Sequence, residues 1–114
     1  MEQTIQQQPL SGIEIIVLKE QIADALRLVF DPEIPVNIYE LGLVYEVNVN
    51  ELGHSNIKMT LTSPSCPAAQ SLPPEVKQRA ESVKGITGAT VEIVWEPRWD
   101  PSMMTEEARL TLGM

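Results

Sequence analysis

The residue with the most versatile chemistry in this sequence is its single cysteine, Cys66. It lies in the segment Thr62-Ser63-Pro64-Ser65-Cys66-Pro67, where Pro67 suits the first position of a helix and would make Cys66 its N-cap. The free N–H groups of a first helical turn favour a thiolate over a thiol, and a thiolate ligates metals or attacks electrophiles. Unpaired cysteines are just as often inert, buried apolar residues, so both interpretations stay open.

Acidic side chains are the second candidate feature. Asp31 and Glu33 flank Pro32, and as a pair they could ligate a hard metal ion or partner a cation such as Arg109. Asp-Pro is also an ordinary signal for the end of a helix, and that interpretation is favoured here. An ion pair with Arg109 would lie at the surface, where such pairs contribute little to stability.

The two tryptophans have different settings. Trp95 falls on the inward-facing positions of a predicted strand, which favours a place in the core. Trp99 lies in a proline-rich segment at residues 96–101, where it either packs down as a lid or projects as an anchor for a protein partner.

Composition narrows the function classes. The 114 residues are 43% hydrophobic and 21% charged, which suits one globular domain. A formal net charge of −8 disfavours nucleic acids and anionic membranes as partners. One cysteine and one histidine exclude an intrachain disulfide and a self-contained Cys/His zinc site.

Neither a membrane span nor a signal peptide is evident, so we expect a cytoplasmic protein. The sequence also lacks a Ser-His-Asp set and a Gly-rich phosphate loop, so we do not expect an enzyme.

Hydrophobic periodicity predicts the elements that would position these residues. Residues 1–12 show no apolar period and are interpreted as a mobile tail, followed by one domain over residues 13–114. Ser11 and Glu14 fit a capping box for a first helix, which is expected to run to about Phe30 and to end at Asp31-Pro32. Alternating residues then predict an antiparallel hairpin of strands at 45–49 and 57–62.

The second half of the chain predicts a crossover. An amphipathic stretch from Pro67 to Gly85 is interrupted by Pro73-Pro74, which favours two short helices or one bent helix. A third strand at residues 90–95 should run parallel to the second. After an extended strap, a last helix capped by Thr105 should end near Gly113. The predicted fold class is therefore a small α/β (α+β) domain.

This topology gathers three loops at one edge of the sheet, at residues 31–42, 62–67 and 96–101. The ends of parallel strands are where open α/β sheets usually bind ligands. The residues at this edge whose side chains could bind a ligand or react are Asp31, Glu33, Glu40, Cys66, Arg98 and Trp99.

At these loops the sequence carries motifs in a fixed order: DPEIPVNIYELGLVY at residues 31–45, TSPSCP at 62–67, WEPRWDPSMM at 95–104, EAR at 107–109 and LG at 112–113. Together they resemble the metal–sulfur cluster biosynthesis family, which includes SufT-like and PaaD-like proteins and cytosolic iron–sulfur targeting proteins of eukaryotes. The resemblance covers about residues 15–113. It implies a small α/β domain and an accessory role in assembling iron–sulfur clusters or transferring them to client proteins.

The resemblance also implies roles for particular residues. Cys66 matches the family's reactive cysteine, and Asp31 and Glu33 match its acidic motif, which Glu40 supports. A cysteine-rich C-terminal extension of the PaaD type is missing, which favours the SufT-like branch. We expect the surface for partners to include Thr62, Pro67, Trp99 and Arg109.

Ligand number bears on how such a protein would handle iron. One thiolate cannot hold a cluster that requires about four protein ligands, so iron or a cluster would be bound in transit and not tightly by one chain. The remaining ligands would come from a second copy in a homodimer, a small thiol or an apo client protein. Iron–sulfur assembly proteins are the other expected partners. Two alternatives are an adaptor that never binds metal and, less favoured, a small thiol-dependent enzyme.

Overall fold

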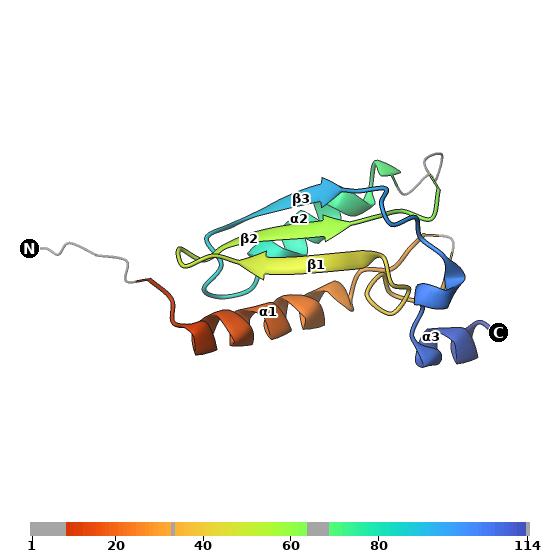
Figure 1. Cartoon of the computed structure of the whole chain (residues 1–114), viewed down its shortest axis with the longest axis horizontal. Coiled ribbons are helices and arrows are strands. Elements are labelled where there is room, and N and C mark those ends of the chain that lie inside the picture. The colour runs from red at the N-terminus through yellow and green to blue at the C-terminus, as the bar shows by residue number, and fades with distance from the viewer. Residues whose placement is uncertain (1–8, 33, 64–68, 114) are drawn as a thin grey trace, which may run out of the picture.

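The computed structural model describes residues 9–32, 34–63 and 69–113 of the chain (Figure 1). The elements follow in the order α1 (Gly12–Leu26), β1 (Val44–Val49), β2 (His54–Met59), α2 (Leu72–Glu81), β3 (Gly88–Ile93), the 3₁₀ helix η2 (Pro101–Met103) and α3 (Glu106–Thr111). The sheet order is β1-β2-β3, with β1 antiparallel and β3 parallel to β2. The predicted fold class and both strand directions are therefore confirmed.

The first helix begins as predicted and ends earlier. Ser11 and Glu14 form the expected capping box, and Leu10 just before it donates its N–H to the Glu51 carbonyl oxygen at 2.9 Å. The expected end at Phe30 was wrong, because α1 stops at Leu26. Residues 28 and 29 continue in tight i→i+3 turns, and Phe30 then pairs as an isolated bridge with Asn37. This pairing takes the chain out of the helix before Asp31-Pro32 is reached.

The crossover stretch contains one α-helix within the described residues. α2 begins at Leu72, with Ser71 as its N-cap. Pro73 and Pro74 lie in the first turn, where the missing N–H groups have no intrahelical partner to lose. The two prolines therefore begin α2 and do not interrupt it, and a separate short helix nearer Pro67 stays a prediction. Cys66 and Pro67 lie outside the described residues.

The sheet has one buried and one polar face. α1 lies along β1, while α2 lies behind β2 and β3 (Figure 1). The core is formed by apolar side chains of both helices, the strands and the loop before β1, among them Ile22, Leu26, Ile38, Leu41, Leu43, Ile57, Met59 and Val76. The opposite face carries polar side chains such as Glu46, Asn56, Thr90 and Glu92. The third strand ends at Ile93, where its partner β2 ends at Met59. Trp95 consequently lies beyond the strand and is 42% exposed, so its predicted place in the core was wrong.

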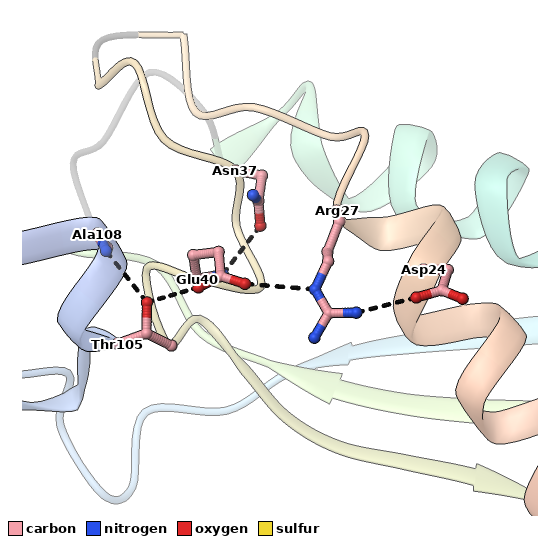
Figure 2. Close-up of polar contacts among 6 residues, drawn as sticks. All are labelled: Asp24, Arg27, Asn37, Glu40, Thr105 and Ala108. Atoms are coloured by element: carbon pink, nitrogen blue, oxygen red, sulfur yellow. Dashed lines mark hydrogen bonds and ion pairs between the residues drawn. The ribbon is translucent and has the colours of Figure 1, made fainter. Parts of the chain in front are cut away.

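Glu40 joins the end of α1, the loop before β1 and α3 (Figure 2). Its carboxylate accepts from Arg27 Nε at 3.3 Å and from Thr105 Oγ1 at 2.5 Å. The Glu40 N–H donates to Asn37 Oδ1, and its carbonyl oxygen accepts from the Thr105 N–H, both at 2.9 Å. Thr105 Oγ1 in turn caps α3 by accepting from the Ala108 N–H at 3.2 Å. The three segments are thus held through one residue, by both its carboxylate and its backbone.

Two side chains fasten the strap, residues 94–105, over the start of β1. The register of β1 shifts between Val44 and Glu46, so Tyr45 is the extra residue of a β-bulge. The Tyr45 hydroxyl donates to the Pro97 carbonyl oxygen at 2.7 Å, and Trp99 Nε1 donates to the Leu41 carbonyl oxygen at 2.9 Å. Gly42 adopts φ +82°, and a Cβ there would come within 2.4 Å of the Met103 carbonyl oxygen. The strap therefore packs directly on backbone.

Replacing Glu40 tests whether it holds α3 in place. Glu40→Ala removes the acceptor of Arg27 and Thr105, and we expect the free energy of unfolding to fall by about 1–2 kcal/mol in urea titrations. A six-residue helix is not stable alone, so amide exchange in α3 should also accelerate. Glu20→Ala, an exposed change on α1, should stay within about 0.5 kcal/mol of wild type. Equal effects of the two substitutions would contradict this role.

Replacing Tyr45 tests the strap at alkaline pH. Tyr45→Phe should lower the free energy of unfolding by about 0.5–1.5 kcal/mol near pH 7, because the hydrogen bond to Pro97 is lost. Burial raises the pKa of the Tyr45 phenol above its ordinary value of 10.0, although a hydrogen bond with Thr60 opposes this. Because the folded-state pKa is the higher one, the unfolded chain ionises first, and the wild type loses stability as pH rises above about 10. The advantage of wild type over Tyr45→Phe should therefore shrink there in urea titrations, whereas an advantage that grows with pH would contradict the assignment.

Candidate functional site

The strand directions bring three loops to one end of the sheet, as the sequence predicted. Val44 at the start of β1 pairs with Met59 at the end of β2, and Met59 pairs with Ile93 at the end of β3. The loop before β1, the segment after β2 and the strap after β3 therefore meet. We call the described residues 29–43, 60–63 and 94–105 the site edge. In Figure 1 it lies at the same end of the molecule as α3, opposite the start of α1.

The site edge contains a cavity of about 230 Å³ between the segment after β2 and the strap. Its lining consists of Leu61, Thr62, Ser63, Trp95, Glu96, Arg98 and Trp99. Thr62 and Trp99, both predicted as site residues, are thus brought together here. The lining combines two indole rings, two hydroxyls and a charge of each sign, so it suits an amphipathic side chain better than a purely apolar one.

Trp99 packs down on the protein, which decides between its two predicted settings. Its indole is half-buried and its N–H is held by the Leu41 carbonyl oxygen. The neighbouring Trp95 and Arg98 are exposed, and the ion pairs among the described residues do not include Arg98. Trp99 therefore forms a fixed wall of the cavity, while Trp95 and Arg98 are available for contact with a visiting molecule.

The acidic candidates occupy different environments. Asp31 is only 5% exposed, which is unusual for a carboxylate. Glu40 is engaged with Arg27 and Thr105 as described above. Glu33, Pro67 and Cys66 lie outside the described residues, so the predicted closeness of the thiol to the acidic motif stays a prediction. Within the described parts of the chain, no three His, Asp or Glu side chains form a potential metal-binding group.

Arg109 also has a partner that sequence reasoning missed. Its Nη2 donates to the Ser102 carbonyl oxygen at 2.8 Å, which ties α3 to the strap. The sequence predicted Asp31 or Glu33 as its partner, and Glu33 is outside the described residues. Arg109 is exposed on α3, next to the site edge.

A second hollow of about 270 Å³ separates the loop before β1 from α3. Phe30, Pro35 and Val36 form one wall, and Glu107, Ala108 and Thr111 form the other. Phe30 is 52% exposed, and Leu110 on α3 is 70% exposed. Sequence reasoning placed Phe30 in α1 and did not find this hollow, because the Phe30 bridge to Asn37 joins residues that show no local pattern.

One further structural finding concerns membranes. Among the described residues, no helix combines the length and the apolar character that crossing a bilayer requires.

Comparison with known proteins gives concordant results. Residues 19–93, more than half of the chain, match the family described as "Iron-sulfur cluster assembly protein". The chain is 48% identical over 100 residues to an Fe-S protein maturation auxiliary factor of Porphyromonas gingivalis, covering 88% of this chain and 95% of the relative. It is 40% identical over 87 residues to the Fe-S protein maturation auxiliary factor SufT of Staphylococcus aureus, covering 76% of this chain and 99% of that protein.

A solved structure matches as well. The crystal structure of a domain of unknown function from Bacillus anthracis superposes with a TM-score of 0.86 at 32% sequence identity, covering 91% of this chain and 99% of that one. The matches agree with the order of elements and with the resemblance noted in the sequence motifs. This chain belongs to the iron–sulfur cluster assembly protein family.

Proposed function

We propose that this chain is an auxiliary factor in the maturation of iron–sulfur proteins in the cytoplasm, with the Cys66 thiolate as a temporary ligand of iron or of a cluster in transit. The observation that carries the proposal is that the single cysteine of the chain falls within residues 19–93, which match the family. The maturation factors of Porphyromonas gingivalis and Staphylococcus aureus, which are similar along most of the chain, support this role.

Ligand number makes the chain a carrier. A cluster is held by four cysteines in its final protein, but this chain offers it one thiolate. The other ligands must therefore come from a donor, a client, a small thiol or a second copy. Transfer is then a ligand exchange: the bond between iron and the Cys66 sulfur breaks while a bond to a client thiolate forms. The client thiol releases its proton to solvent, Cys66 takes one up, and no electron moves.

The acidic residues serve this exchange in two ways. Asp31 and Glu33 set the charge around the thiol; the burial of Asp31 supports this assignment, because a buried carboxylate acts at low effective dielectric. Glu40 acts as a positioning residue, since its carboxylate holds Arg27 and Thr105 and thereby the loop that carries Asp31.

The site edge provides the surface for donor and client proteins. Thr62 and Trp99 line its cavity, the exposed Arg109 lies on the adjoining α3, and Pro67 follows Cys66 in the sequence. The exposed Trp95 and Phe30 on either side are side chains of the kind that anchor protein interfaces. These exposed aromatics also favour a second candidate function, in which the domain joins a cluster donor to its client without binding metal.

Substitution of the cysteine separates the two candidates. After anaerobic incubation with ferrous iron, sulfide and dithiothreitol, gel filtration is run in buffer that still contains dithiothreitol to supply the remaining ligands. Wild type should then co-elute with iron and sulfide, whereas Cys66→Ala should carry only background amounts. His54→Ala is the matched control, because it removes the single imidazole of the chain, which is also able to bind iron, and it should behave like wild type.

The cellular readout completes this test. In cells depleted of the native protein, Cys66→Ala should fail to restore the activity of a [4Fe–4S] dehydratase, while His54→Ala should restore it. Full restoration by Cys66→Ala would remove the thiol from the mechanism and leave the adaptor function.

Substitution of the exposed tryptophan tests the partner surface. Trp95→Ala should lower maturation of the same dehydratase several-fold, and it should cost only about 1 kcal/mol of folding stability because the ring is partly exposed. Leu52→Ala, a truncation of a 62% exposed side chain in the turn between β1 and β2, should leave maturation unchanged. If Trp95→Ala matures the dehydratase as well as Leu52→Ala does, the partner surface lies elsewhere.

A further inference from the structure

The N-terminal half of α1 exposes an apolar stripe that the proposed function does not use. Ile13, Ile16 and Val17 are 75%, 62% and 47% exposed. Their i, i+3 and i+4 spacing places them on one face of the helix, away from the face that buries Leu18 and Ile22. Scattered exposed apolar residues are ordinary, but neighbouring ones on a single helix face mark a docking surface.

The stripe continues beyond the helix. A groove of about 300 Å³ beside it is lined by apolar side chains, among them Leu10, Ile13 and Val17, and by one charged side chain of each sign, Glu14 and Lys84. Leu10 is bonded to the turn between β1 and β2, where Leu52 is 62% exposed. The apolar surface therefore joins the start of α1 to that turn, with Lys84 as a cation at its border.

Acidic residues extend the same helix face toward its C-terminal end. Glu20 and Asp24 follow Ile16 at intervals of four, and both are exposed. The outer face of α1 is thus apolar in its first half and acidic in its second. The start of the helix carries the partial positive charge of its free N–H groups and lies beside Lys84, and its one acidic side chain, Glu14, accepts from the Ser11 N–H at 2.8 Å.

We propose that this face pairs with a second copy of the chain, with the two α1 helices antiparallel. If the two-fold axis passes near residue 15, Ile13 of one copy lies level with Val17 of the other. Glu20 then lies level with Leu10 of the second copy, close to the positive end of that helix and to its Lys84. A two-fold arrangement makes each of these contacts twice, so the surface is complementary to itself in both polarity and charge.

The small surface makes this dimer a weak one. A few side chains per copy fall short of the roughly 1,200 Å² that stable interfaces bury, so we expect a dissociation constant between about 1 μM and 1 mM. Because the start of α1 and the site edge lie at opposite ends of the molecule (Figure 1), the two site edges of the dimer face away from each other. Each would remain open to donor and client proteins.

Sedimentation velocity of the full chain at 0.15 M salt, from about 10 μM to 1 mM, tests the pairing. The average mass of wild type should rise from 12.7 kDa toward twice that value as concentration increases. Ile16→Glu should remain a monomer throughout. Leu110→Glu is the matched control, because Leu110 is 70% exposed on α3, and it should associate like wild type. Circular dichroism checks that both variants fold.

Charge exchange tests the antiparallel arrangement. Glu20→Lys and Lys84→Glu should each weaken dimerisation by about tenfold, and combining them should restore it. A wild-type mass that stays at 12.7 kDa up to 1 mM overturns the proposal, as does an Ile16→Glu variant that still dimerises. Failure of the double exchange to restore association overturns the antiparallel pairing. Binding of monomeric wild type, but not Ile16→Glu, to phosphatidylcholine vesicles would instead assign the face to a lipid surface.

Discussion

The carboxylate of Glu40 is the contact on which the architecture of the site edge depends. It joins its own loop to two segments with which that loop shares no regular hydrogen-bond ladder: the end of α1 through Arg27, and α3 through Thr105. The backbone N–H of Glu40 donates to Asn37 Oδ1 and fixes the loop itself. Its side chain is 16% exposed while that of Arg27 is 42% exposed, so the ion pair is partly screened by water. The bond to Thr105 is the more consequential one, since the same hydroxyl caps α3.

Much of the architecture follows from sequence because its signals are local. The Ser11–Glu14 capping box, the alternation in the hairpin and the Thr105 cap each depend on residues a few positions apart, and all three occur. The error at the end of α1 came from a non-local contact. Phe30 pairs with Asn37, and no periodicity within α1 signals that its last turn gives way to this bridge. Pro73 and Pro74 are ambiguous in sequence, because prolines can begin a helix as well as interrupt one.

The site was predictable in outline and not in detail. Strand directions place the three loops together, and Thr62 and Trp99 do line one cavity. Two facts required coordinates. The register shift in β1 directs Tyr45 toward the strap, and Trp95 leaves the sheet because β2 ends opposite Ile93. In both cases the position of the side chain depends on the neighbouring strand. The alternation of apolar and polar residues within one segment contains no information about where that neighbour ends.

The close approach at Gly42 has a consequence for how this surface can change during evolution. The turn and the strap touch backbone to backbone, and any side chain at position 42 would collide with the Met103 carbonyl oxygen. A homologue with a larger residue at this position must therefore carry a longer or displaced strap. If the site edge recognises client proteins as proposed, differences in recognition between homologues should arise through paired changes in these two segments.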